Sequence, residues 1–292
     1  MRLLLVLMLW GCSAPPAVVS TPPQAAVASV PWRSCLLDGA SPCVSTAPIR
    51  VATELIAWSD WLGDHPGVEC RWVAELDHVL LCGSAAIGPI NTALVRASIF
   101  VEMQPRVVVE RTDPMYLAAM KLIAGHDLMK RHREGRPDLL QFYAALDRAC
   151  AATQSVCADP SEQAMRRLLE TTWAQHTDLV VLTFARHGPI ADDETVSHEI
   201  LHAQYFTDPK FREVITDYWW LLPEEDRAAI RRTLAGTYST KDHELMQNEM
   251  QAYALMSGGE RTRFRALLAH RDALLRRLAE RGLRPIAVQQ RD

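Results

Sequence analysis

The feature that most constrains the fold is residues 195–205, which read Thr-Val-Ser-His-Glu-Ile-Leu-His-Ala-Gln-Tyr. This segment contains His-Glu-x-x-His, with His198 and His202 flanking Glu199. Residues four apart share one face of an α-helix, so the two imidazoles would project side by side. Such a pair suits a tetrahedral zinc ion, and Glu199 on the adjacent flank can reach a water molecule on the metal. The segment therefore predicts a metal-binding helix, in preference to two surface histidines on an amphipathic helix.

A catalytic zinc site needs a third protein ligand and an open position for water. Asp208 follows His202 by six residues and could ligate, but Tyr205 stands where a glycine would allow a tight turn back to the metal. A carboxylate on a later helix is the second option, and Glu249 supplies it. Glu244 or His243, about one helical turn earlier, is the third option. Glu244 and Glu249 are about 140° apart around a helix, so they are not expected to bind the same metal.

Two segments, 198–202 (His-Glu-Ile-Leu-His) and 248–253 (Asn-Glu-Met-Gln-Ala-Tyr), together resemble the gluzincin arrangement of zinc metallopeptidases. In that family a glutamate from a separate downstream helix completes a His/His/Glu site, which implies Glu249 as the third ligand. The resemblance covers about residues 178–257, where a strand, the active helix, a connecting segment and a ligand helix follow in the expected order. Many gluzincins place an aspartate four residues after the ligand glutamate to brace a zinc-bound histidine. Here Tyr253 holds that position, so either a bracing role or hydrogen-bond donation to an oxyanion is open to it.

The resemblance implies one Zn²⁺ per chain and hydrolysis of a peptide bond by a zinc-bound water. Glu199 would act as general base and then return the proton to the leaving amine. The strand expected at 179–185 resembles the edge strand that pairs with extended substrate in this class of enzyme. Charge on the carbonyl oxygen needs a further donor, for which the candidates are Tyr238, His243 and Tyr253.

The N-terminus predicts export to a bacterial cell envelope. Arg2 precedes an apolar run at 3–10 that is too short to span a bilayer, so residues 1–11 are expected to be a signal peptide. Leu9-Trp10-Gly11-Cys12 resembles a bacterial lipobox, which implies cleavage before Cys12, lipidation of its thiol and attachment to a lipid bilayer. Ser13 favours the outer membrane, with the protein facing the periplasm or the cell surface. Residues 12–32 are rich in Pro, Ala and Ser and predict a disordered tether.

Cysteine usage agrees with that compartment. Removing Cys12 from the seven cysteines leaves six, an even number suited to three disulfides in an oxidising environment. Their connectivity has fifteen possibilities. Because each closes a short loop, we favour the local pairs Cys35–Cys43, Cys70–Cys82 and Cys150–Cys157.

The rest of the pattern predicts an α+β protein, predominantly helical, with a small sheet in a zincin-like core around the active helix. Residues 33–113 are expected to be β-rich, with one hairpin across Asp77-His78 and another across Gln104-Pro105. Residues 114–292 are expected to form the helical catalytic region. The predicted helices are at 115–134, 137–151, 160–175, 223–235, 244–256 and 261–281. The active helix is expected to be capped by Asp192 or Asp193, to run through 198–202 and to stop near Asp208-Pro209.

The net charge bears on which class of partner the protein binds. A net charge of −4 gives no support for nucleic-acid binding through bulk electrostatics, so a peptide or protein substrate is the expected partner. Two alternatives remain open. One is a non-catalytic envelope lipoprotein whose zinc is structural or absent, and the other is an amidase acting on cell-wall peptide.

Overall fold

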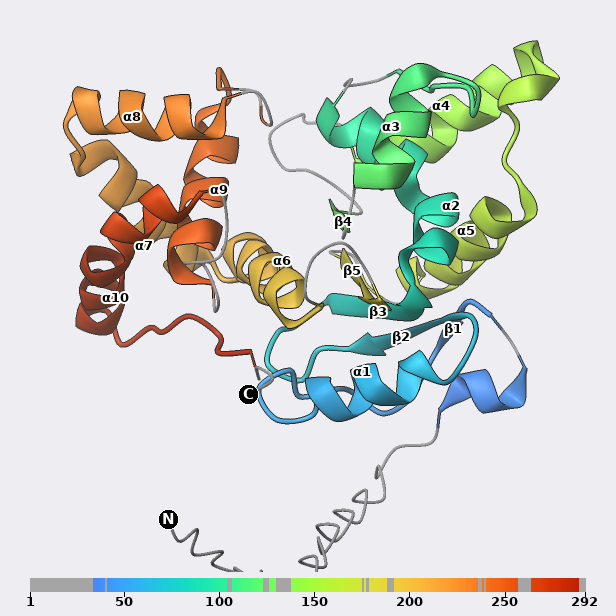
Figure 1. Cartoon of the computed structure of the whole chain (residues 1–292), viewed down its shortest axis with the longest axis horizontal. Coiled ribbons are helices and arrows are strands. Elements are labelled where there is room, and N and C mark those ends of the chain that lie inside the picture. Colours follow the sequence, from blue (N-terminus) through green and yellow to red (C-terminus); the bar gives the residue numbers. More distant parts are fainter. Residues whose placement is uncertain are drawn as a thin grey trace, which may run out of the picture. The chain divides into compact units, whose positions relative to one another are not determined.

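The structure is a computed structural model, and its helices and strands are labelled in Figure 1. The residues it describes from position 34 onward belong to one compact unit. The predicted signal peptide, Cys12 and the tether lie outside the described residues. None of the helices in the described part is both long and apolar enough to cross a membrane. The described residues are 34–39, 41–103, 107–122, 126–129, 138–174, 176, 179–187, 192–235, 238, 240–256 and 264–288.

The described strands form one mixed sheet in the order β1-β2-β3-β5-β4. β3 and β5 are parallel at its centre, β2 and β4 run antiparallel to them on either side, and β1 is parallel to β2. The sheet takes strands from both sides of the boundary expected at 113/114, so the two predicted regions share one sheet. The strand bounds are β1 Cys43–Val44, β2 Val68–Trp72, β3 Val79–Ala86, β4 His126–Met129 and β5 Val180–His187.

Alternate residues of the two central strands face opposite cores. Leu80 of β3 and Val181 of β5 join a core with α2 (Ile87–Ser98), α4 (Leu139–Ala152) and α5 (Pro160–Trp173). Val79 and Val180 join a second core on the other face, with α1 (Leu55–Gly63) and α6 (Asp192–Thr207). Helices on both faces explain why the sequence of β5 is an almost continuous apolar run rather than an alternating one.

A glycine inside β3 allows α1 to pack closely on the sheet. A Cβ atom at Gly83 would lie 2.4 Å from Cδ1 of Leu62 and 2.7 Å from the ring of Phe184. Glycine normally weakens a strand, and one inside a strand often marks such a close approach. Gly83 therefore lets Leu62 and Phe184 meet over the strand.

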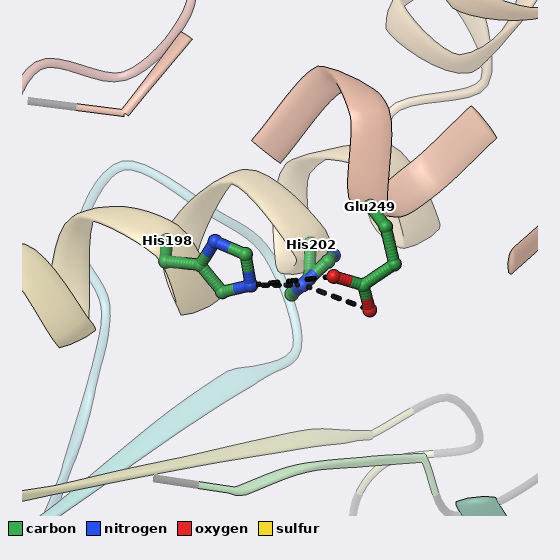
Figure 2. A group of neighbouring side chains, drawn as sticks. All are labelled: His198, His202 and Glu249. Carbon is green, nitrogen blue, oxygen red and sulfur yellow. Dashed lines mark hydrogen bonds and ion pairs between the residues drawn. The ribbon is translucent and has the colours of Figure 1, made fainter. Parts of the chain in front are cut away.

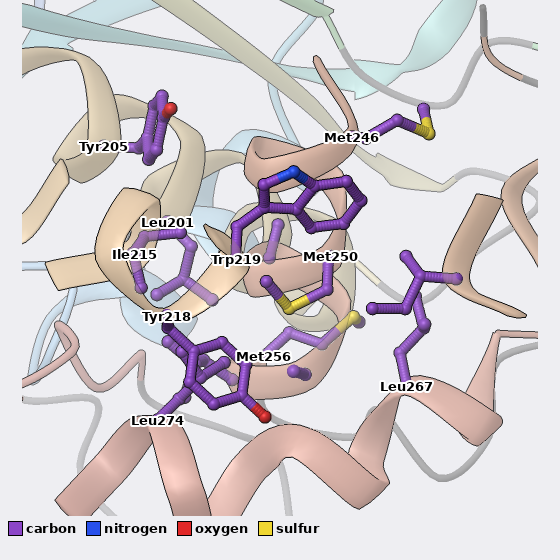
Figure 3. Packing of buried hydrophobic residues seen from close by; sticks show 14 of the residues in the cluster. Leu201, Tyr205, Ile215, Tyr218, Trp219, Met246, Met250, Met256, Leu267 and Leu274 are labelled. Carbon is purple, nitrogen blue, oxygen red and sulfur yellow. The ribbon is translucent and has the colours of Figure 1, made fainter. Parts of the chain in front are cut away.

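The last third of the chain forms a helical layer with its own apolar core (Figure 3). This core contains buried side chains from every helix from α6 to α10, including Trp219 and the methionines Met246 and Met250. The helices beyond α6 are α7 Pro209–Leu221, α8 Glu224–Leu234, α9 His243–Leu255 and α10 Arg271–Glu280. The predominantly helical α+β class is therefore confirmed.

Several local predictions are confirmed. β2 and β3 pair as the predicted hairpin, and Cys70 lies directly opposite Cys82. All three preferred disulfides are present, Cys35–Cys43, Cys70–Cys82 and Cys150–Cys157. Pro160 begins α5, where Asp159 and Glu162 form a reciprocal capping box.

Other predictions are wrong. In each case contacts with residues distant in sequence, and not the local hydrophobic pattern, determine the structure. The second hairpin is absent: residues 99–103 continue α2 as a π-helix, and 107–110 have no strand. Buried Ile99 and Phe100 explain the apolar run, which periodicity alone could not separate from a strand. The helix expected at 115–134 ends at Leu122 as α3 (Pro114–Leu122), and β4 follows at 126–129 because β5 offers it a partner.

Two further differences concern helix ends. α6 begins at Asp192, so Asp192 and Asp193 fall in its first turn rather than before it. The final helix begins later than expected, with a 3-10 segment at Arg265–His270 preceding α10. Residues 261–263 lie outside the described part of the chain.

Candidate metal centre

Helix α6 presents its two histidines on a face turned away from the sheet. Val196 and Ile200 pack into the core beneath the sheet, and Leu201 and Tyr205 pack into the helical core. The face that carries the histidines adjoins the one that packs against α9. The apolar spacing of α6 thus fixes which way the His-Glu-x-x-His residues project.

The third member of the group comes from α9. Asp242 caps this helix by accepting a hydrogen bond from the backbone N–H of Leu245 (3.0 Å), and Met246 and Met250 anchor it in the helical core. Glu249 lies between those methionines in sequence and its carboxylate points toward the histidines (Figure 2).

The three side chains converge to within 4.8 Å of one another. The Nε2 atoms of His198 and His202 are 2.8 Å apart. Glu249 Oε2 lies 3.6 Å from Nε2 of His198, and its Oε1 lies 3.7 Å from Nε2 of His202. Ligand atoms about 2.1 Å from a tetrahedral zinc ion are about 3.4 Å from one another, so these separations bracket the value that a shared ion requires. The predicted group of His198, His202 and Glu249 is therefore brought together.

Burial makes a metal the natural counter-charge for this group. The side chains of His198, His202 and Glu249 are only 12, 3 and 7% exposed. A carboxylate placed in such surroundings is costly unless a cation or strong donors compensate it. The donor set fits a divalent ion of the zinc type, with two nitrogens and one oxygen.

Buried glutamine amides join α6 to α9, and neither glutamine was among the residues predicted from the sequence to belong to the site. The Nε2 amide of Gln251 donates to the backbone carbonyl of Leu201 (3.1 Å), and Tyr205 donates its hydroxyl to Oε1 of Gln247 (3.1 Å). Thr216 on α7 donates to the same oxygen (3.0 Å). Gln247 and Gln251 are four residues apart on α9. This spacing puts both on one helix face and could have been recognised in the sequence.

Two of the three predicted oxyanion donors lie beside the group. The ring of Tyr253 packs against that of His198 with centroids 4.3 Å apart, and its hydroxyl is 2.9 Å from that of Tyr238. Burial, followed by the nearby charge of Glu249, raises the pKa of Tyr238 well above its ordinary value of 10.0. The Tyr238 phenol therefore stays protonated and can donate. His243, at the start of α9, instead packs against the ring of Trp220 (5.2 Å).

The remaining candidates take distinct places. Glu199 is half-buried on α6 beside His198. Asp208 caps α7 by accepting from the N–H groups of Lys210 (3.0 Å) and Phe211 (3.1 Å), and it does not join the histidines. Glu244 lies in the first turn of α9 and also falls outside the group.

The strand expected to lie at the sheet edge is internal. β5 pairs with β3 on one side and with β4 on the other, so the edge next to it belongs to β4 in the described part of the sheet. The expectation came from an apolar strand preceding the active helix, and that pattern carries no information on which strands flank it. β4, which also contacts α6, is the terminal strand of the described sheet on that side.

No protein-family model, curated protein or solved structure matches the chain. The site geometry therefore carries the functional assignment.

Proposed function

We propose that this protein is a zinc-dependent metallopeptidase of gluzincin type, exported to the bacterial cell envelope. The observation that carries the proposal is the convergence of His198 and His202 from α6 with Glu249 from α9. The histidines belong to a His-Glu-x-x-His segment that also provides Glu199 as a neighbouring carboxylate. This donor set suits zinc, and a fourth position remains for water.

The residues of the chain divide the chemistry between them. Bound zinc would supply a Lewis acid that polarises a carbonyl and acidifies water. Glu199 accepts a proton from the attacking water and returns it to the leaving amine nitrogen. The Tyr238 and Tyr253 pair provides hydroxyl groups beside the ligands, where negative charge develops on the carbonyl oxygen.

β4 supports a peptide as the substrate. An extended peptide adds to an open sheet edge through main-chain hydrogen bonds, and such pairing by itself imposes little sequence preference. Among the described strands β4 is the terminal one on that side, runs antiparallel to β5 and contacts α6. We propose that substrate pairs with β4 rather than with β5.

The disulfides support the proposed location. Three disulfides form and persist in an oxidising compartment such as the bacterial envelope. Lipidation of Cys12 would tether the folded unit to a bilayer. Metabolic labelling with a fatty-acid analogue should mark the wild-type protein and leave Cys12→Ala unmarked; labelling of the variant would contradict the anchor.

The decisive experiment combines metal analysis with hydrolysis of a peptide library. We expect one tightly held zinc per chain, and Glu199→Gln should keep it while losing about 10²–10⁴-fold in hydrolysis, the usual contribution of a general base. Glu249→Ala should lose the tight zinc, whereas Glu244→Ala on the same helix should retain it.

Three outcomes would contradict the proposal. Absence of tight zinc after zinc-supplemented refolding removes the metal site, and full activity in Glu199→Gln removes the assigned base. Zinc that is retained with no hydrolysis of any library peptide would instead indicate a structural metal in an envelope lipoprotein.

A further inference from the structure

A second pair of histidines meets outside the proposed active site. His78 occupies the turn between β2 and β3, and His176 lies between α5 and β5. Their Nδ1 atoms are 3.3 Å apart, and their ring planes are inclined by 64°. The parallel pairing of β3 with β5 creates this meeting, because Val79 is the partner of Val180 and the N–H of Val180 donates to the carbonyl of His78 (3.0 Å).

We propose that His78 and His176 together bind one divalent transition-metal ion through their Nδ1 atoms. Two imidazole nitrogens bound at about 2.1 Å to a tetrahedral ion lie about 3.4 Å apart, close to the observed 3.3 Å. The approach of like ring nitrogens repeats what is seen at His198 and His202. Imidazole suits Cu²⁺, Ni²⁺ and Zn²⁺, and affinity for a given nitrogen site is expected to be highest for Cu²⁺.

The surroundings constrain the ring of His176 and the backbone of His78. The indole of Trp72 packs against His176 with centroids 4.4 Å apart. His78 has a φ of 62°, the one positive value at a non-glycine residue in the described chain. Glycine would adopt that conformation at lower cost, yet the turn carries an imidazole.

This site differs in kind from the group on α6 and α9. His78 is exposed and His176 half-buried, so an ion can enter from solvent and water can complete its coordination. With two protein ligands instead of three, the ion should exchange more freely than the tight zinc. It would also link the turn before β3 to the segment before β5.

The test titrates the full chain, stripped of metal, with Cu²⁺ and follows the ion by pulsed electron paramagnetic resonance, which detects coordinated imidazoles. The wild type should take up a second, weaker Cu²⁺ with two imidazole ligands, and His78→Asn and His176→Gln should each lose it. Asn is chosen at position 78 because it tolerates positive φ. His187→Gln, at an exposed histidine elsewhere in the sheet, is the matched control and should keep both ions.

A thermal measurement provides a second readout. A metal that binds only the folded protein should raise the unfolding temperature of the wild type by roughly 5 °C at a hundredfold excess over its Kd. In His78→Asn, metal binding at the second site should not raise the unfolding temperature. Circular dichroism should show that this variant is folded.

The outcomes separate this inference from the proposed function. Retention of the second ion in both histidine variants, or its equal loss in His187→Gln, would overturn the inference. Binding that persists in Glu249→Ala supports it. If the His198 and His202 group binds no metal while the His78 and His176 pair does, the inference stands and the peptidase proposal falls.

Discussion

His198, one of the three ligands of the proposed zinc site, has aromatic neighbours. Tyr253 supports His198 with the face of its ring, while its hydroxyl lies next to that of Tyr238. Phe264 packs against the rings of both tyrosines. Aromatic packing and a pair of phenols therefore lie where the gluzincin resemblance would lead one to expect a bracing aspartate.

Tyr238→Phe should weaken zinc binding. The change removes a hydroxyl that donates toward Glu249 but keeps the ring, and loss of a comparable supporting contact usually costs at least about tenfold in metal affinity. Competition with a chromophoric chelator measures the change. Tyr218→Phe, which removes a hydroxyl far from the ligands in sequence, is the control and should leave the zinc Kd unaltered; equal affinities for both variants and wild type would contradict the assignment.

His270 should make stability depend on pH. Its Nδ1 lies 2.8 Å from the Tyr218 hydroxyl, and burial lowers its pKa below the ordinary 6.5. A histidine with a lowered folded-state pKa contributes stability that is fully present above the unfolded value and is lost as pH falls through the folded one. Urea unfolding of metal-free protein should therefore show a decline in stability below about pH 6.5. His270→Gln should flatten that decline, and an unchanged profile would exclude the histidine as its cause.

At the scale of elements, contacts close in sequence could be predicted and most of those across the fold could not; the exception is Glu249, which the gluzincin resemblance placed with the two histidines. The β2–β3 hairpin, the capped start of α5 and the three short-loop disulfides each follow from residues near one another. β4 could not be predicted, because its strand conformation comes from pairing with β5, more than fifty residues later. The same holds for the site. The His-Glu-x-x-His motif can be recognised from adjacent residues, whereas the contact of Gln251 with α6 depends on how the two helices pack.

Gln251→Met should loosen the docking of α6 on α9. The side chain is fully buried, and methionine keeps much of its volume while removing the donor to the Leu201 carbonyl. The same amide also donates to Oδ1 of Asn248 (3.1 Å), so loss of the two hydrogen bonds should lower the free energy of unfolding by about 2 kcal/mol. Zinc affinity should fall as well, because the ligands come from the two helices that this contact joins. Gln163→Met, at an exposed glutamine on α5, should change neither quantity in the same urea and chelator titrations.

At the scale of the whole molecule, stability and the proposed chemistry are built in different parts of the chain. All six disulfide cysteines precede residue 158, and the ligands lie on α6 and α9. The connection between the two parts is β5, which pairs with disulfide-bonded β3 and packs against α6. A buried cross-link in the sheet therefore supports the active helix from beneath without touching the ligands.

Removing the Cys70–Cys82 disulfide should separate these two contributions. The bond closes a loop with a sequence separation of 12 between two fully buried residues, so Cys70→Ala/Cys82→Ala should lower the free energy of unfolding by about 3 kcal/mol in urea titrations. Well below its unfolding temperature, the variant should bind zinc as tightly as the wild type, because the contacts joining α6 to α9 are intact. Cys150→Ala/Cys157→Ala, which opens a shorter loop at the end of α4, is the comparison and should also keep zinc affinity. A large loss of affinity in the first variant alone would show that the sheet, and not the contact between the two helices, sets the spacing of the ligands.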